Sequence, residues 1–600
     1  MRTLANAIER PGDPAPSDPA LGRVRLAGLT LFEGLDETML GAVEAQLEWF
    51  SLPGGWILFR RGEEADALYV VASGCLGVMV RGEDGLETLV ARICEGETVG
   101  EMGLISGEPR SATVVSLHDT ELLRLPKAAY ERLIERHPQA MLRLTGLLAR
   151  RLRSTTHGAD RAPMAKNLAL VPLNPALPDA VLVQGLVEAL SDSGLRVRLL
   201  DSSAAEHTTE WFHAVGAAHD LVVYRAEPDP TAWTQLCLRQ ADRVLLLAAA
   251  ASAPPVGLPI ESCLGDAMRR SELVLLHDGA VIRPQGTARW LERLPVDTHY
   301  HVRLGAPRDL ARLARFVTDR AVGLVLSGGG ARGFAHVGVI RALREAGVPL
   351  DRLGGTSIGG IVAAGLGLEW DDGELADRLR RAFARSNPLS DYTLPLIALV
   401  RGRKVTRLLR GHFGDVRIED LWLPYFCVSS NLTRGSMMAH RRGPLWRALR
   451  ASVAIPGVLP PVVEAGQVLV DGGVIDNFPI DVMSAMRRGP VIGVDVATDR
   501  ALTAPPADLE DGSPWRLLRR GRGAPVIVSL LLRAGTVSAD ARTRLFRSHA
   551  DLLFEPPLET IDMLDWRAFD RAIEIGYRYA VEMLGHLDKP LFRTPARAVA

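Results

Sequence analysis

The chain has 600 residues and a formal charge of −1 at neutral pH, because 70 Lys and Arg residues balance 71 Asp and Glu residues. With 47% hydrophobic and 24% charged residues, it has the composition of a globular protein and not of a disordered, collagen-like or coiled-coil chain. The near-zero charge excludes a global field that would draw the protein to nucleic acid or to a membrane. The length predicts roughly four structural units.

The cysteines and the amino terminus indicate the compartment. Five scattered cysteines form no Cys-x-x-Cys pair, so we expect neither a disulfide framework nor a structural zinc site, and a reducing, cytoplasmic location fits best. Residues 1–20 lack the apolar core of a signal peptide and are predicted to be a flexible leader. No apolar run reaches the ~20 residues that a membrane-spanning helix needs, so any membrane contact would be peripheral.

Residues 21–153 show short β-rich runs separated by glycines, which is the pattern of an all-β barrel. The runs lie at 56–59, 67–71, 76–80 and 113–116. Apolar spacing over 127–153 then predicts one or two amphipathic helices, broken near His137-Pro138. Residues 154–166 are polar and are predicted to be a linker.

Two α/β units are expected after the linker. Residues 167–320 alternate short, fully apolar strands with helices, as a parallel sheet requires. Residues 321–500 form a second unit with strands near 322–326, 425–429 and 491–496. Residues 501–600 are predicted to be a helical extension packed on that second unit.

The richest motif is Gly328-x-Gly330-x-x-Gly333, between an apolar strand and a helix. Its spacing matches a dinucleotide-binding fingerprint, with Asp351 near the position of a ribose-binding acid. The same glycines would also let backbone N–H groups face a transient oxyanion. A nicotinamide-dependent enzyme therefore stays open as an alternative.

A second motif indicates a nucleophile. In Gly355-Thr-Ser-Ile-Gly359, Ser357 would lie on a tight strand-to-helix turn that lifts its hydroxyl clear of the sheet. No downstream histidine lies in a distinctive motif, whereas Asp471 follows an apolar strand and precedes two glycines. The simpler interpretations are a surface serine in a glycine loop and a turn-forming aspartate.

Together, Gly328–Gly333, Gly355–Gly359 and Asp471–Gly473 resemble the patatin-like phospholipases, as does the segment 445–461 that precedes the aspartate. Further segments resemble the neuropathy target esterase group, which joins cyclic-nucleotide-binding-like domains to a patatin-type catalytic region; they lie at 233–246, 284–290, 555–557 and 574–577. The resemblance implies a multidomain protein: a β-barrel, then α/β units, the catalytic one a three-layer α/β/α fold.

By the resemblance, Ser357 is the nucleophile and Asp471 the base of a Ser–Asp dyad. The N–H groups of Gly328, Gly329 and Gly330 would form the oxyanion hole, and Arg332 would hold that loop or contact a phosphate head group; these are residues of the first motif. The implied reaction is hydrolysis of carboxylic esters of phospholipids or lysophospholipids through an acyl-enzyme. A lipid ester would be the substrate and no cofactor would be required.

The segments 96–104 and 109–114 resemble the phosphate-binding cassette of cyclic-nucleotide-binding domains. By that match Glu101 would contact the ribose 2′-hydroxyl and Arg110 the cyclic phosphate, assisted by the backbone of Gly100, Ser111 and Ala112. Cyclic AMP or cyclic GMP would then be an effector. No basic recognition helix follows Arg153, so we expect no nucleic-acid partner.

Several alternatives remain open. The chain could be a non-catalytic cyclic-nucleotide sensor whose hydrolase domain is a scaffold. His299 and His301 alternate along a strand, but a histidine pair without a third ligand favours a structural role, and we expect no metal. Residues 391–404 suit a lid, a membrane-touching helix or a core helix. The lipid, the ester position and the oligomeric state are not set by the sequence.

Overall fold

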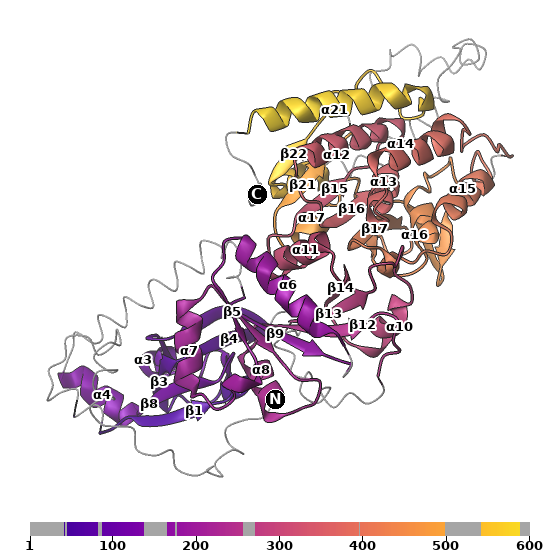
Figure 1. Cartoon of the computed structure of the whole chain (residues 1–600). Helices are drawn as coiled ribbons and strands as arrows, with labels where there is room; N and C mark the ends of the chain where they lie inside the picture. Colours follow the sequence, from indigo (N-terminus) through magenta and orange to yellow (C-terminus); the bar gives the residue numbers. More distant parts are fainter. Residues whose placement is uncertain are drawn as a thin grey trace. The chain divides into compact units, whose positions relative to one another are not determined.

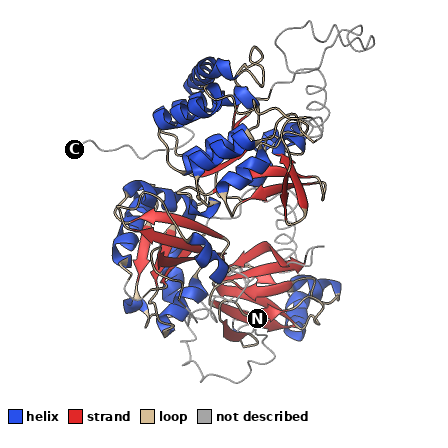
Figure 2. Cartoon of the chain, turned by 90° about the vertical axis from the view of Figure 1, so that its right-hand side faces the viewer, coloured by secondary structure: helices blue, strands red, loops and turns tan. Residues whose placement is uncertain are grey.

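The computed structural model describes residues 41, 45–81, 87–136, 165–174, 177–255, 270–394, 397–497 and 542–587 (Figures 1 and 2). The chain divides into two compact units. The first comprises residues 1–249, 255–274 and 295–298, and the second comprises 250–254, 275–294 and 299–600. Within the described residues, no helix is both long and apolar enough to cross a bilayer. The predicted leader and linker lie almost entirely outside the described residues.

The first eight strands form a barrel of two four-stranded antiparallel sheets, ordered β1-β8-β3-β6 and β2-β7-β4-β5. On β3, Leu68 and Val70 pack toward Tyr130 of helix α4, while Tyr69 and Val71 belong to the core between the sheets. The elements are β1 Glu48–Leu52, β2 Ile57–Phe59, β3 Ala67–Ser73, β4 Cys75–Arg81, β5 Glu87–Cys94, β6 Thr98–Val99, α3 Glu101–Ser106, β7 Thr113–Ser116, β8 Thr120–Pro126 and α4 Lys127–Arg136.

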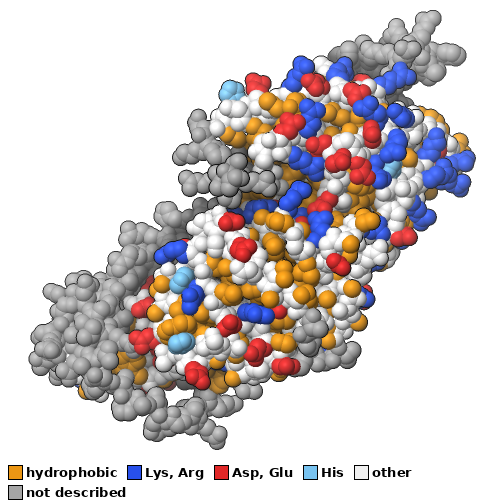
Figure 3. Space-filling model, in the orientation of Figure 1, with side chains coloured by type: hydrophobic (Ala, Val, Ile, Leu, Met, Phe, Trp, Pro, Cys, Tyr) orange, Lys and Arg blue, Asp and Glu red, His pale blue; other side chains and the backbone are white. Residues whose placement is uncertain are grey.

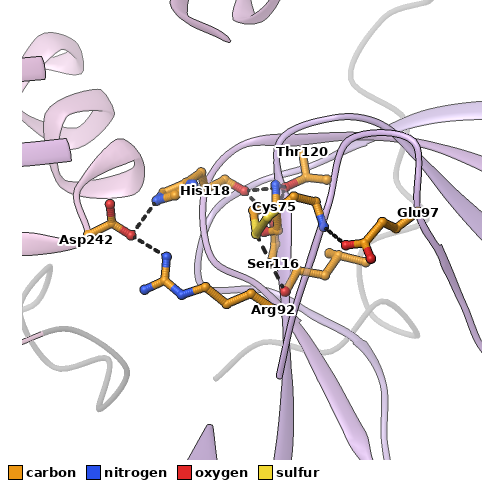
Figure 4. Close-up of a disulfide and its surroundings, with 9 residues drawn as sticks. Cys75, Arg92, Glu97, Ser116, His118, Thr120 and Asp242 are labelled. Carbon is orange, nitrogen blue, oxygen red and sulfur yellow. Dashed lines mark hydrogen bonds and ion pairs between the residues drawn. A yellow bond between two sulfur atoms is a disulfide. The ribbon is translucent and has the colours of Figure 1, made fainter. Parts of the chain in front are cut away.

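Two cysteines of the barrel are joined, contrary to the expectation from their scatter along the chain. Cys75 on β4 lies directly opposite Cys94 on β5, and the two form a disulfide with their Cα atoms 4.2 Å apart (Figure 4). Strand pairing thus brings together residues that are 19 positions apart in the sequence. Cysteine usage therefore does not indicate a reducing compartment. Cys237 and Cys427 are free and buried.

A six-stranded sheet follows, in the order β10-β11-β9-β12-β13-β14. Its first four strands are parallel, as their fully apolar sequences predicted. The elements are β9 Asn167–Pro172, α6 Asp179–Asp192, β10 Val197–Leu200, η2 Ser202–Ala204, α7 Thr209–Ala218, β11 Leu221–Arg225, α8 Ala232–Gln240, β12 Arg243–Ala249, β13 Arg270–His277, α10 Thr287–Arg293, β14 Thr298–Arg303 and α11 Pro307–Val317.

The last sheet has eight strands in the order β19-β20-β17-β16-β15-β21-β22, with β18 also paired to β17. Strands β17, β16, β15, β21 and β22 run parallel, and β18, β19 and β20 form the antiparallel edge. The strands are β15 Gly323–Leu326, β16 Arg352–Thr356, β17 Tyr425–Asn431, β18 Ser436–His440, β19 Val462–Glu464, β20 Gln467–Asp471, β21 Val491–Val494 and β22 Leu552–Phe554.

Helices cover both faces of this sheet and so form the three predicted layers. Leu324 and Leu326 of β15 belong to a core shared with α12, α13 and α21, whereas Val325 packs with Ile480 and Met483 of α17 on the other face. The helices are η3 Gly330–Phe334, α12 Ala335–Glu345, α13 Ile358–Gly367, α14 Asp372–Leu379, η4 Arg380–Ala384, α15 Arg403–Phe413, η5 Ile418–Asp420, α16 Leu445–Ser452, η6 Gly472–Val474, α17 Ile480–Ser484, η7 Arg547–His549, η8 Trp566–Ala568 and α21 Phe569–Gly585. The predicted fold class is confirmed.

Candidate active site

Ser357 lies on a strained turn between β16 and α13. Its backbone has φ 54° and ψ −120°, a region that costs a non-glycine residue of order 1–3 kcal/mol. The flanking glycines make the turn possible. A Cβ on Gly355 would lie 2.7 Å from the carbonyl carbon of Gly359, and a Cβ on Gly359 would clash with the carbonyl oxygen of Leu326. The pentapeptide therefore forms the tight strand-to-helix turn that its sequence predicted.

The structure brings Ser357 and Asp471 into hydrogen-bond contact. The Ser357 hydroxyl donates to Oδ2 of Asp471 over 2.9 Å, and the N–H of Gly473 donates to Oδ1 over 2.8 Å. Burial raises the pKa of Asp471 to about 6, although both hydrogen bonds act to lower it. The carboxyl is thus mainly ionised at neutral pH but close enough to neutrality to take a proton from the serine.

The last residue of α16 and the segment that follows it hold both members of this pair. The N–H of Ser357 donates to Oγ of Ser452 over 2.9 Å, and the N–H of Asp471 donates to the carbonyl oxygen of Ala454 over 2.9 Å. Ser452 is fully buried. The sequence singled out this region only by resemblance and missed the role of Ser452, because nothing in its local pattern predicts a bond to the nucleophile's backbone.

The glycine loop lies beside the nucleophile, but one of its three predicted oxyanion donors is already engaged. The N–H of Gly328 donates to the carbonyl oxygen of Asn477 over 3.1 Å, and Nδ2 of Asn477 donates back to the carbonyl oxygen of Gly328 over 3.1 Å. This reciprocal pair fixes the start of the loop. Gly329 and Gly330 remain as candidate donors, and Asn477 is a loop-holding residue that the motif search missed.

Arg332 ties the glycine loop to the C-terminal part of the chain. Its Nε donates to the carbonyl oxygen of Ile561 over 2.7 Å, and the neighbouring N–H of Ala331 donates to the carbonyl oxygen of Met563 over 2.8 Å. Gly330 has φ 58°, and a Cβ there would clash with the same Met563 oxygen. Of the two roles considered for Arg332, the geometry supports the one that holds the loop.

An apolar cavity, partly open to solvent, reaches Ser357. Apart from Ser357, its only polar or charged lining side chains in the described part of the chain are Arg378 and His412. The remainder of the wall is built from α13–α15, the segment after α16 and residues 563–566; it comprises Gly330, Ile358, Ile361, Trp370, Leu379, Ala382, Phe383, Pro388, Leu389, Val405, Leu408, Leu409, Phe413, Val453, Ile455, Val458, Leu459, Met563, Leu564 and Trp566. Such a wall suits a hydrocarbon chain.

The remaining histidine and nucleotide hypotheses lose support. In the described ranges, no histidine hydrogen-bonds to Ser357; His440 pairs instead with Ser429 over 2.7 Å. Asp351, considered for a ribose, is buried and accepts from Arg315 and from the N–H of Val322. It is therefore unavailable to a nucleotide, and the glycine motif serves another purpose.

His299 and His301 both donate from Nε2 to the carbonyl oxygen of Glu419, over 3.0 and 2.9 Å. His277 extends the cluster, with its Nε2 2.9 Å from Nδ1 of His301. Across the described ranges, no group of three or more His, Cys, Asp or Glu side chains has the arrangement of a metal site. Burial lowers the pKa of His277 to about 4 and also lowers those of His299 and His301. The three rings are therefore neutral at physiological pH.

In the segment 391–404, which suited a helix, the described residues before Arg403 are not helical. Tyr392 and Val400 form an antiparallel bridge, and helix α15 begins only at Arg403. The apolar side chains of this segment do not share one buried face, as those of a helix would. Val400 is 1% exposed, whereas Leu394 is 73% exposed.

In the barrel, the structure brings Gly100 and Arg110 together. Arg110 is buried over the ring of Phe59, and its Nη1 donates to the carbonyl oxygen of Gly100 over 2.9 Å. Its Nη2 donates to Asp66 and to the carbonyl oxygen of Ala67. The buried Nε–H of Arg110 has no partner among the described residues.

The other predicted cassette residues lie around this guanidinium to different depths. Glu101 begins helix α3 and is 4% exposed. Ser111 is exposed and Ala112 is half-buried. The Arg110 guanidinium is therefore fixed by Asp66 and by the backbone of Gly100 and Ala67, while its Nε–H has no partner among the described residues.

Comparisons with known proteins agree with these three folded regions. Residues 49–137 match the cyclic nucleotide-binding domain, 165–321 the Neuropathy Target Esterase family P-loop like domain, and 324–484 the patatin-like phospholipase family. The chain is 30% identical to human patatin-like phospholipase domain-containing protein 6, over 90% of this chain and 44% of that protein. It is 28% identical to lysophospholipase nte1 of Aspergillus terreus, over 94% of this chain and 44% of that protein.

The chain thus spans less than half the length of these curated relatives. Similar solved structures include the Thermus thermophilus catabolite activator protein, with 32% identity over 27% of this chain and 68% of that chain and a TM-score of 0.20. The regulatory domain of Toxoplasma gondii PKA with cAMP gives 28% identity over 20% of this chain and 46% of that chain, with a TM-score of 0.19.

Proposed function

We propose that the chain belongs to the neuropathy target esterase group of the patatin-like phospholipases and is a serine esterase that hydrolyses carboxylic esters of phospholipids or lysophospholipids. One observation carries the proposal. The Ser357 hydroxyl, hydrogen-bonded to the Asp471 carboxylate, meets a cavity whose wall is almost entirely apolar. A nucleophile with a base, placed beside a site for hydrocarbon, is the arrangement that cleavage of a fatty acyl ester requires.

In the proposed mechanism Asp471 removes the proton from Ser357 while Oγ attacks the ester carbonyl carbon. The N–H groups of Gly329 and Gly330 receive the negative charge that develops on the carbonyl oxygen, a stabilisation typically worth ~3 kcal/mol per donor. Asp471 then gives its proton to the leaving alcohol, and an acyl-enzyme ester remains on Ser357. Water, deprotonated by Asp471, attacks this ester, and Asp471 returns the proton to Oγ of Ser357 as the bond between Oγ and the acyl carbon breaks and the fatty acid is released.

The test is a panel of lysophospholipids and diacyl phospholipids, with release of free fatty acid as the readout. Ser357→Ala and Asp471→Asn should each lower kcat by ~10³-fold or more, because the two residues act as a unit. Ser436→Ala and Asp415→Asn are matched controls at exposed positions of the same unit and should keep full activity. Ester hydrolysis by Ser357→Ala at more than a few per cent of the wild-type rate would contradict the assignment.

We further propose that the barrel binds a cyclic nucleotide as an effector. The buried Nε–H of Arg110, which has no partner among the described residues, supports this, because a charged donor left without an acceptor can bind a phosphate oxygen. Titration calorimetry with cyclic AMP and cyclic GMP should detect binding to the full chain, and Arg110→Gln should abolish it. Unchanged binding by Arg110→Gln would contradict this site.

An ester-hydrolysis assay and the calorimetry together separate the esterase from the alternative of a non-catalytic sensor. A sensor with a scaffold hydrolase domain would bind the nucleotide but would not turn over p-nitrophenyl butyrate, a small soluble ester. We expect turnover of this ester, and its loss in Ser357→Ala.

A further inference from the structure

Three large apolar side chains project from one short loop of the second unit. Tyr392, Leu394 and Ile397, here called the apolar tip, are 72%, 73% and 75% exposed. The base of the loop is ordered by a bridge between Tyr392 and Val400, and Val400 itself is buried. The loop is therefore anchored at its base while its apolar side chains face outward. Apolar groups gathered in this way on a folded protein mark an interaction surface.

The loop is built against the wall of the cavity. Its return arm is hydrogen-bonded to the segment after α16: the N–H of Leu399 donates to the oxygen of Gly457 over 2.9 Å, and that of Val400 to the oxygen of Val458 over 3.1 Å. Val458 lines the cavity, as does Leu389 on the approach to the loop. The apolar tip is thus continuous with the wall that would receive the acyl chain.

The residues around the loop are strongly basic. The segment 385–413 contains six Lys or Arg residues and one acidic residue, Asp391. Asp391 accepts from the N–H of Lys404, at the start of α15. In Figure 3, Lys and Arg side chains gather over the position that α15 has in Figure 1.

Helix α15 separates its two kinds of side chain. Arg403, Arg407 and Arg410, here called the basic face, are exposed, whereas Val405 and Leu409 are buried and line the cavity. One helix therefore presents positive charge to solvent and hydrocarbon to the cavity.

We propose that the apolar tip and the basic face form the surface by which the protein docks on an anionic phospholipid bilayer. The tip inserts among the lipids and the arginines contact the anionic head groups. The exposed arginines indicate an anionic bilayer, because three positive charges add no binding energy at a neutral surface or in an apolar protein groove. It rests on the lipid-ester hydrolysis proposed above, since docking places the cavity wall at the membrane that holds the substrate.

The first experiment measures binding without catalysis. The full chain carrying Ser357→Ala is sedimented with vesicles of phosphatidylcholine alone or with about one-third phosphatidylserine. We expect binding to the anionic vesicles, weakened as salt rises because surface charges are screened. Adding Leu394→Ser with Ile397→Ser should weaken binding at least ~10-fold, since two apolar contacts with the bilayer are lost. The matched control, Ile282→Ser with Val581→Ser, alters two other exposed apolar side chains and should bind normally.

The second experiment removes charge. Arg403→Gln with Arg407→Gln should weaken binding to anionic vesicles ~10-fold or more, because each basic residue near the surface contributes about fivefold. Arg567→Gln with Arg578→Gln removes the same charge from exposed positions in the C-terminal part of the unit and is the control. Equal binding to neutral and anionic vesicles, no vesicle binding, or tip and basic-face variants that bind like their controls would overturn the proposal.

Activity separates this proposal from the one on which it rests. With Ser357 intact, the tip and basic-face variants should hydrolyse soluble p-nitrophenyl butyrate at the unchanged rate but should lose activity on vesicle lipids in proportion to binding. If the unmodified chain does not hydrolyse the soluble ester, the proposed function fails, while the vesicle binding of Ser357→Ala still decides the docking surface. A loss of soluble-ester activity in the tip variants alone would count against a docking role.

Discussion

The carboxyl of Asp471 determines the pH range in which the proposed esterase works. Burial raises its pKa to about 6, and only the ionised form can accept the proton of Ser357. We therefore expect kcat/KM for a soluble ester to be constant above about pH 7 and to fall tenfold per pH unit below about pH 6. A pH–rate profile checks this, and a profile flat down to about pH 4 would contradict it.

The raised pKa of Asp471 affects the stability of the folded protein in the opposite direction. The folded-state pKa of Asp471 lies above the ordinary value of 3.8, so the fold favours the protonated carboxyl. The contribution of this group to stability is therefore largest below about pH 4 and declines as the pH rises through about 6. The ionised base that catalysis needs is accordingly held at a cost in stability, as is common at active sites.

Ser452 is expected to act as a positioning residue. Its hydroxyl accepts the N–H of Ser357, whose backbone is strained, and Ser452→Ala would leave that N–H without this acceptor. We predict a fall in kcat of ~10–100-fold with little change in KM, because the cavity is intact and only the nucleophile's position changes. The pH midpoint should stay near 6, because the bonds to Asp471 are untouched.

Steady-state kinetics on p-nitrophenyl butyrate measures the effect, with Ser436→Ala on the surface of β18 as the control. A merely structural role would lower the melting temperature of Ser452→Ala and leave the kcat of the folded fraction unchanged, which would contradict the positioning role.

The residues proposed to react with the substrate were easier to predict from the sequence than the residues that hold them in place. Ser357 and Asp471, which the structure brings into hydrogen-bond contact, could be singled out from the sequence because short glycine-containing motifs surround them, and such motifs are local in sequence. Ser452 and Asn477 were missed because each acts through hydrogen bonds to the backbone of a residue that lies 95 or 149 positions away. Gly328 was assigned as a donor from its place in the motif, and only the fold shows that its N–H is already used by Asn477.

At the scale of helices, the C-terminal helix α21 is held on α12 by two glycines. A Cβ on Gly338 of α12 would clash with the carbonyl oxygen of Ile573, and a Cβ on Gly576 of α21 would clash with the carbonyl oxygen of Ala335. Each helix therefore rests its backbone directly against the other. This close crossing fixes the C-terminal part of the chain to the same layer as the nucleophile's helix.

Gly576→Ala should accordingly destabilise the second unit by several kcal/mol, because the obstructing atoms are backbone and the helices must separate. Gly585→Ala, on the same helix with no atom within 4 Å of the added Cβ, should be neutral or slightly stabilising. Thermal unfolding of the two variants tests the crossing. Equal melting temperatures would show that the crossing tolerates a methyl group.

The elements that the sequence missed have physical reasons in common. The long apolar strands β9, β12 and β15 were predicted because both of their faces are buried. Strand β16 was expected only as the strand before the Ser357 turn and not from an apolar run, because it contains Gly354, where a Cβ would clash with the ring of Phe426 and packing demands a glycine. Strand β22 was missed because it has three residues and gains its place only by pairing with β21.

At the scale of whole domains, the barrel and the following α/β domain are joined by buried carboxylates within the first unit. Asp242 accepts from Arg92 over 3.0 Å and from His118 over 3.1 Å (Figure 4). It also accepts from the N–H groups of Lys166 and Asn167. Burial alone would raise the pKa of Asp242, but these partners lower it well below its ordinary value. The segment 233–246, identified only by its resemblance, therefore carries a docking residue for the barrel.

A second carboxylate reinforces the junction from the opposite side. Asp119 of the barrel accepts from Nε of Arg239 over 3.0 Å, and its carbonyl oxygen lies 3.1 Å from Nε2 of His213. Each domain thus offers one acid to the cations of the other. We infer that the barrel and the α/β domain move as one body. Such a rigid junction would transmit a conformational change in the barrel to the α/β domain.

Asp242→Ala should therefore loosen the junction, because Arg92 loses its buried partner and two backbone N–H groups lose their acceptor; removal of one partner of a buried pair typically costs ~3–5 kcal/mol. Hydrogen exchange should rise in the turn that carries His118 and at the start of β9, while hydrolysis of a soluble ester stays unchanged. Asp220→Ala, which breaks the exposed pair with Arg196, is the matched control. Because the folded-state pKa of Asp242 is lowered, the wild-type junction should itself weaken as the pH falls below about 4. Exchange at this turn that is identical in Asp242→Ala and Asp220→Ala would show that the carboxylate does not hold the barrel.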